Sequence, residues 1–146
     1  MSIVRQALAL FAVAALAVAP GCSRTPTETQ LRAEMAAAQA ALEGRDVGAL
    51  REVLADDFVG PDGLDRAGAG RLAQGVFLRY RDVGVTIGPL DITLRDEFAT
   101  VRFTAAARGG AGGVLPQSAQ VYDVETGWRF TDGEWRMTSA RWKPRL

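Results

Sequence analysis

The second half of this chain alternates apolar and polar residues, and this two-residue period constrains the fold more than any other feature. Successive side chains of a β-strand point to opposite faces, so the pattern predicts strands with one apolar and one polar face. The dipeptide Asp132-Gly133 is typical of a tight hairpin turn, and residues 109–116 predict a longer hairpin connection. We therefore expect a mainly antiparallel sheet. The alternating apolar residues are Val83, Val85, Ile87, Leu90, Ile92, Leu94, Val101, Phe103, Ala105, Tyr122, Val124, Trp128, Phe130, Trp135 and Met137.

Three helices are predicted before this sheet. Thr27 and Gln30 have the spacing of a capping box, and apolar residues at helical spacing follow, which predicts a first helix over residues 28–43. Asp46 can cap a second, shorter helix that ends near Asp56. A short extended piece and a tight turn at Pro61-Asp62-Gly63 come next, and Asp65 can then cap a third helix. The apolar stripe of the third helix consists of Leu72, Val76, Phe77 and Tyr80.

The N-terminus has the pattern of a secretory signal. Arg5 is followed by an unbroken apolar run over residues 7–19, 13 residues in all, and Pro20-Gly21 ends it. A run of that length matches the hydrophobic region of a signal peptide and is shorter than the roughly 20 residues that span a bilayer. We expect residues 1–21 to be a signal segment.

Composition excludes several kinds of site. The chain has no His, and its single Cys is Cys22. Zinc, copper and non-haem iron sites would therefore need carboxylates alone, and Ser-His-Asp or Cys-His nucleophilic systems cannot form within one chain. The formal net charge is +0, and no run of Lys or Arg is present to neutralise phosphates, so we expect no nucleic acid partner. We also expect no metal and no cofactor.

The segment that ends Val18-Ala19-Pro20-Gly21-Cys22 resembles a bacterial lipobox. The resemblance implies that Cys22 receives diacylglycerol before cleavage, so that acyl chains anchor the protein in a membrane. Ser23 in the next position is similar to an outer-membrane address, which implies a lipid-anchored protein that faces the periplasm. Ala19 and Pro20 depart from the usual lipobox, which leaves open cleavage by an ordinary signal peptidase and a domain free in the periplasm. The expected division is signal peptide 1–21, lipidated tether 22–27 and domain 28–146.

The order of three helices followed by long strands, ending in W-x-x-x-D-G-x-W-R at residues 128–136, resembles the nuclear transport factor 2-like superfamily with its SnoaL-like and ketosteroid-isomerase-like branches. The resemblance covers residues 31–142. It implies an α+β fold in which a cone-shaped, curved antiparallel sheet packs on three N-terminal helices, with a pocket at the open end. Isomerases, dehydratases and noncatalytic adaptors all share this fold, so the fold leaves the function open.

The residues expected around such a pocket are mostly apolar. The dehydratase branch depends on a pocket His, which is absent here, and the isomerase branch uses a Tyr of the first helix, which here has none. A carboxylate beside the pocket, Asp57, with a tyrosine would be the remaining catalytic arrangement. Arg141 could bind an anionic group. The expected pocket set is Asp57, Phe77, Tyr80, Phe103, Tyr122, Trp128 and Arg141.

Two classes of function follow from these patterns. The first is a noncatalytic, lipid-anchored cell-envelope protein that binds a small apolar ligand or an envelope protein. The second is a small-molecule isomerase or cyclase that uses Asp57 and a tyrosine. An empty apolar cavity would favour a ligand, and a filled interior with an exposed apolar patch would favour a protein partner. We expect a monomer or a weak dimer, because charged residues and threonines dominate the open face of the sheet.

Overall fold

The computed structural model describes residues 25–110 and 118–145. The signal segment, Cys22, Ser23 and most of the 109–116 connection lie outside these residues, so the expectations for them stay predictions. Within the described ranges, no helix combines the length and the apolar character needed to cross a bilayer.

Each of the three helices begins at the cap residue that the sequence indicates. The predicted capping box is complete: Thr27 Oγ1 accepts from the backbone N–H of Gln30 at 3.2 Å, and Gln30 Oε1 accepts from that of Thr27 at 3.0 Å. At the other two helices, the carboxylate of Asp46 accepts from the backbone N–H of Ala49 and that of Asp65 from the backbone N–H of Gly68. The helices are α1 (Glu28–Glu43), α2 (Val47–Val53) and α3 (Arg66–Arg79).

The second helix is shorter than predicted because a strand follows it at once. The chain forms β1 (Leu54–Val59) and a 3-10 turn, η1 (Pro61–Gly63), before α3 begins. β1 pairs in parallel with the last strand of the chain, and Phe58 is buried. This pairing partner lies about 80 residues away, so local helical spacing could not reveal where the helix gives way to a strand.

The sheet has six strands in the order β1-β6-β5-β4-β2, with β3 also paired to β4. All pairings are antiparallel except that of β1 with β6. At the predicted turn Asp132 has φ 55° and Gly133 φ 79°, the left-handed pair that a tight hairpin requires. The remaining strands are β2 (Asp82–Ile87), β3 (Asp91–Arg95), β4 (Phe98–Gly110), β5 (Ser118–Thr131) and β6 (Glu134–Pro144).

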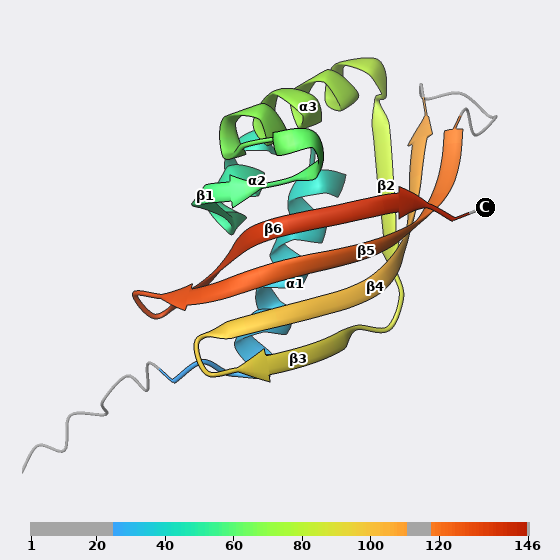
Figure 1. The fold of residues 1–146 in the computed structure, drawn as a ribbon. Helices are drawn as coiled ribbons and strands as arrows, with labels where there is room; N and C mark the ends of the chain where they lie inside the picture. The colour runs from blue at the N-terminus through green and yellow to red at the C-terminus, as the bar shows by residue number, and fades with distance from the viewer. Residues whose placement is uncertain (1–24, 111–117, 146) are drawn as a thin grey trace, which may run out of the picture.

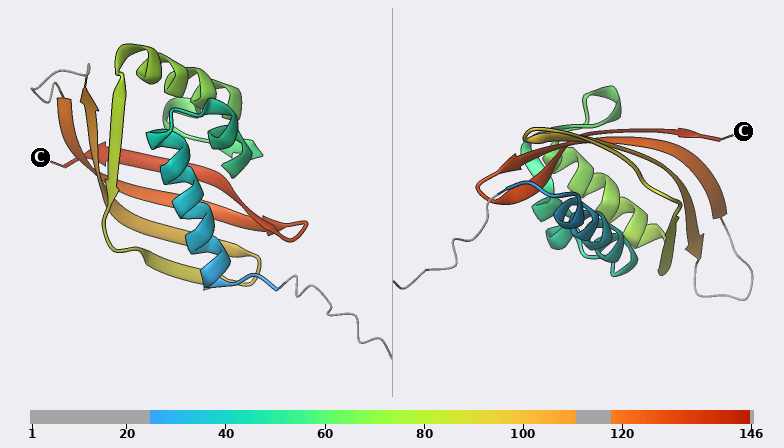
Figure 2. Two further views of the ribbon diagram at one scale, coloured as in Figure 1. Left: turned by 180° about the vertical axis from the view of Figure 1, so that it is seen from behind. Right: turned by 90° about the horizontal axis from the view of Figure 1, so that it is seen from below.

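The sheet is strongly curved and open on one side. β4 pairs with β3 along its first residues and with β2 along its last ones, so the long strands bend between these two neighbours (Figure 1). Helices α1 and α3 lie on the concave side (Figure 2). This arrangement confirms the predicted fold class, three helices packed on a curved sheet.

The apolar face of the sheet meets the helices in the core. Leu31 of α1 packs with Val101, Trp128 and Trp135, all at most 1% exposed, at the end of the sheet where β5 and β6 form their hairpin. The rings of Phe130 and Trp135 meet edge to face there, with centroids 5.3 Å apart. One end of the concave face is thus filled by large rings.

Candidate functional site

At the other end of the concave face, a cavity of about 330 Å³ lies between the sheet and helices α1 and α3. This volume falls within the range of roughly 300–1,000 Å³ in which proteins hold small molecules. Nearly all of the wall is carbon. The helices contribute Met35, Ala38, Gln39, Leu42, Leu50, Ala69, Leu72, Ala73, Val76 and Phe77, and the strands contribute Leu54, Phe58, Val83, Val85, Ile87, Phe103, Ala105, Val124, Thr126, Met137, Ala140 and Trp142; Leu64 completes the lining.

Gln39 and Thr126 bring an amide and a hydroxyl to the lining, and the protein itself uses their donors. Gln39 Nε2 donates to the carbonyl of Val85 at 2.7 Å and to Glu43 Oε1 at 3.1 Å. Thr126 Oγ1 donates to the carbonyl of Val101 at 3.4 Å and accepts from the indole N–H of Trp128 at 2.8 Å. A molecule in this cavity would therefore meet a surface that offers contact area and almost no hydrogen bonds.

Within the part of the chain that the structure describes, the lining holds no ionisable side chain. No Asp, Glu, Lys, Arg or Tyr is among the described residues of the cavity wall. Elsewhere in the described ranges, no group of three potential metal ligands is close enough to hold a metal ion. The cavity residues can exclude water and match a shape, but they supply no general acid or base.

The structure places two of the seven predicted pocket residues in the cavity wall, Phe77 of α3 and Phe103 of β4. Trp128 lies in the packed core beyond the cavity and is 1% exposed. Tyr80 lies outside the wall: its ring rests on Gly109, where a Cβ would come within 2.7 Å of the ring. Tyr122 pairs with Ala105 on β4 and is half-buried without lining the cavity.

Asp57 differs most from its predicted place. Its carboxylate is 65% exposed and forms a two-pronged ion pair with the guanidinium of Arg129 at 2.8 and 3.1 Å, outside the cavity. The hydrogen bond from Arg129 lowers the pKa of this carboxyl, which stays charged at neutral pH. The catalytic arrangement of Asp57 with a pocket tyrosine is therefore not formed.

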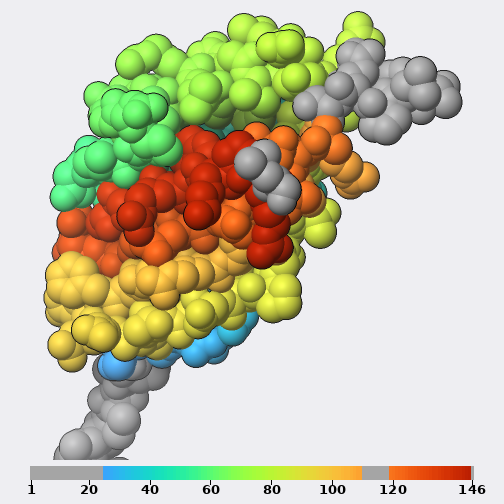
Figure 3. Space-filling view, turned by 45° about the vertical axis from the view of Figure 1, so that its right-hand side comes forward, coloured from blue at the N-terminus to red at the C-terminus, as the bar shows by residue number. Residues whose placement is uncertain are grey.

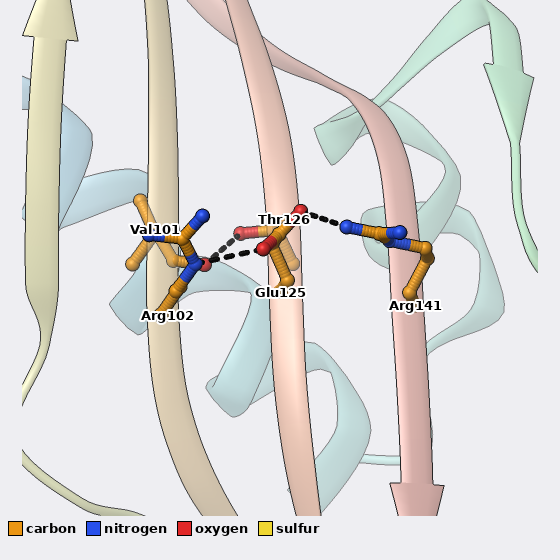
Figure 4. A network of polar contacts seen from close by, with 5 residues as sticks. All are labelled: Val101, Arg102, Glu125, Thr126 and Arg141. Atoms are coloured by element: carbon orange, nitrogen blue, oxygen red, sulfur yellow. Dashed lines mark hydrogen bonds and ion pairs between the residues drawn. The ribbon is translucent and has the colours of Figure 1, made fainter.

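Arg141 lies on the outer face of the sheet, in a row of charges across three strands. Glu125 of β5 accepts from Arg102 of β4 at 2.7 Å and also from Arg141 of β6 (Figure 4). The hydrogen bond from Arg102, followed by that from Arg141, lowers the pKa of Glu125. Arg141 is 74% exposed and already paired, so it does not reach the cavity.

Sequence reasoning missed most of the cavity wall. The alternation had identified Val85, Ile87 and Val124 as apolar, and the helical stripe had identified Leu72 and Val76, but neither pattern separates a filled core from a hollow one. Small side chains would have been the signal, because alanines recur among the inward positions of α1, α3, β4 and β6.

No protein-family model and no curated protein sequence matches this chain. Solved structures do. A putative dehydratase from the NTF2-like family of Streptomyces avermitilis superposes with a TM-score of 0.67 at 18% identity, covering 81% of this chain and 95% of that one. An NTF2-like protein with a cystatin-like fold from Novosphingobium aromaticivorans gives 0.64 at 18%, covering 78% and 79%. The chain has the NTF2-like, cystatin-like fold.

A longer protein is similar in structure over part of its length. Bd1075 of Bdellovibrio bacteriovorus superposes with a TM-score of 0.71 at 11% identity over 80% of this chain, which spans only 41% of that protein. Identities this low support the fold and leave the activity of this domain to be argued from its own cavity.

Proposed function

We propose that this NTF2-like domain binds a small apolar molecule in the cavity between its helices and its sheet, without chemistry on it. The observation that carries the proposal is the 330 Å³ cavity with its carbon wall. Burial of apolar surface stabilises a complex by about 25 cal/mol per Å², and a concave wall buries most of a small ligand.

Binding is favoured over catalysis by the residues of the wall. A general acid or base must lie within hydrogen-bond reach of the atom it serves, and the described lining contains no ionisable group. The hollow interior beneath α3 also favours binding of a small molecule over binding of a protein partner.

A substitution inside the cavity tests the proposal. Ala105 lines the cavity, and Ala106 beside it on β4 faces the opposite side of the sheet. A carbon group takes up about as much space as a water molecule in the liquid, roughly 30 Å³. The three carbon groups that Ala105→Leu adds therefore remove about a quarter of the cavity. We expect the protein to bind naphthalene, a fluorescent apolar molecule of ten carbons. Ala105→Leu should weaken this binding at least tenfold, whereas Ala106→Leu should leave it unchanged. Equal affinities of the two variants would show that the fluorophore binds elsewhere.

We further propose that the domain works in the cell envelope, held at the outer membrane by acylated Cys22 and facing the periplasm. The signal-like segment and the lipobox resemblance support this placement. In a bacterial host, the wild-type chain should fractionate with membranes and Cys22→Ser should be released, while Ser23→Ala keeps its lipid. Membrane-bound Cys22→Ser protein would contradict the anchor, and soluble periplasmic wild-type protein would favour an ordinary signal peptide.

A further inference from the structure

The cavity has one stretch of wall that faces the solvent. Three of its described lining residues are exposed to solvent. The exposed fraction is 50% for Leu72, 37% for Val76 and 39% for Trp142. Leu72 and Val76 lie one helical turn apart on α3, and Trp142 lies near the end of β6. Figure 3 shows this face of the molecule, with β6 in red beneath α3 in yellow-green. We call these three residues the mouth.

A polar groove adjoins the mouth on the outside. It is formed by η1 and the first turns of α3 and shares Leu64, Leu72 and Trp142 with the cavity. Its charged members are Asp62, Asp65 and Arg71. Across the residues that the two share, the surroundings thus change from a carbon wall to a charged surface.

This change points to the class of ligand, on the assumption that the proposed function holds. A polar head inside the cavity would lose its hydration without gaining hydrogen bonds, whereas an apolar tail in the groove would stay in water. We propose that the ligand is a single-tailed amphiphile that enters between α3 and β6, places its tail in the cavity and leaves its head in the groove, with Trp142 as the residue that closes the mouth over the tail.

The cavity volume sets the length of the tail. At roughly 30 Å³ for each carbon group, 330 Å³ holds about eleven of them. Each methylene that leaves water should strengthen binding about fourfold until the cavity is full, and further methylenes should add little. A diacyl phospholipid has two longer tails and does not fit. The head lies in an open groove where solvent screens charges, so its charge should change the affinity by less than about fivefold.

Trp142 also provides the signal for the experiment. Trp128 and Trp135 are each 1% exposed in the packed core, so a change of intrinsic fluorescence on ligand binding reports on Trp142. Binding of n-alkanoates of six to fourteen carbons, each below its micelle concentration, would be followed by calorimetry and by this fluorescence. We expect fourfold tightening per methylene up to an alkanoate of about twelve carbons, of which the carboxyl carbon stays in the groove, and then a plateau. Alkanols with the same tail should give similar values, and phosphatidylcholine vesicles should not compete.

Variants of the mouth separate this proposal from the proposed function. Leu72→Lys puts a charge into the mouth, and Leu78→Lys is its matched control, because Leu78 is 82% exposed on the same helix and lies outside the cavity wall. We expect Leu72→Lys to slow alkanoate association at least tenfold and Leu78→Lys to leave the association rate unchanged. Trp142→Phe should lose the fluorescence response, and Trp142→Ala should speed dissociation.

The possible failures are distinct. Alkanoate binding that leaves Trp142 fluorescence and the Leu72→Lys rate unchanged would overturn the proposed mouth and leave the cavity function in place. Affinity that rises through fourteen carbons without a plateau, or phospholipid vesicles that compete, would overturn the single short tail. No binding of any apolar probe would overturn the proposed function itself.

Discussion

Thr126 offers a measurable test of how the core is held together. Among the residues that the structure describes, it is the one buried polar side chain, 2% exposed, and its hydroxyl accepts from the indole N–H of Trp128 at 2.8 Å. Its own proton points to the carbonyl of Val101 over a long 3.4 Å. Thr126→Val keeps the shape of the side chain and removes both interactions.

The expected cost follows from what Trp128 loses. Its indole nitrogen is buried and donates to Thr126 alone among the described residues, so the variant leaves a buried donor unsatisfied, which costs about 1–3 kcal/mol. The extra methyl group offsets up to about 0.8 kcal/mol. We therefore expect the free energy of unfolding to fall by about 1–2 kcal/mol and Tm to fall by roughly 3–10 °C.

A double-mutant cycle in urea isolates the hydrogen bond from packing. In a Trp128→Phe background the donor is gone, so Thr126→Val should then be nearly neutral, with a coupling of about 1–2 kcal/mol between the two sites. Thr126→Ser keeps the acceptor and serves as the control for the loss of a methyl group. If Thr126→Val costs the same in both backgrounds, the hydrogen bond does not stabilise the core and the reasoning is wrong.

Three further outcomes concern the surface. Arg45 donates to the carbonyl of Phe77 in the last turn of α3, so Arg45→Ala should lower the free energy of unfolding by about 1 kcal/mol in thermal denaturation. Arg129 lowers the pKa of Asp57 in the folded protein, so the ion pair stabilises the fold fully above the unfolded pKa of about 3.9, and this contribution is lost as the pH falls through the lower folded pKa. In Arg129→Gln, an NMR titration should find the folded pKa of Asp57 raised towards its ordinary value. Thr27→Ala removes the capping box and should cost about 1 kcal/mol in urea unfolding.

Features of the fold that depend on neighbouring residues were predictable from the sequence. The capping box of Thr27 with Gln30 and the hairpin at Asp132-Gly133 are both local patterns with one dominant structure, and both are present. The two-residue alternation likewise predicted which face of each strand is apolar, because the period of a strand is two whatever its partner.

Features that depend on distant residues were not predictable in this way. β1 becomes a strand because β6 pairs with it, and that pairing sets the end of α2 at Val53 and turns Asp57 outward toward Arg129. Strict alternation from Trp135 and Met137 would put Arg141 on the inner face, but a β-bulge interrupts β6 opposite Gly127 and Trp128 of β5, so Arg141 faces out. One such shift decides which residues of β6, Trp142 among them, face the cavity.

Whether the concave face is filled or hollow depends on a balance of volumes that no single position reveals. At one end the indoles of Trp128 and Trp135 occupy the space between sheet and helices. At the other end the facing residues include Ala38, Ala73 and Ala105, whose methyl groups do not reach across a curved sheet. The same alternation therefore produces a packed core and a cavity within one domain.

The cavity should leave a trace in stability as well as in binding. Cavities left by truncated core side chains lower the free energy of unfolding by about 24 cal/mol per Å³. On that scale a cavity of 330 Å³ costs at most roughly 8 kcal/mol, which is large beside the about 5–15 kcal/mol by which a domain is stable. Ala105→Leu should recover about 2 kcal/mol of this in the empty protein while it weakens ligand binding. A wall made almost wholly of carbon accepts three more carbon groups as readily as it accepts a ligand tail. Wild-type protein should gain comparable stability only when ligand is present, in proportion to ln(1 + [L]/Kd). Unfolding of both proteins in urea with and without decanoate measures the two effects, and an empty Ala105→Leu protein less stable than wild type would mean that the space beneath α3 is not open to additional carbon.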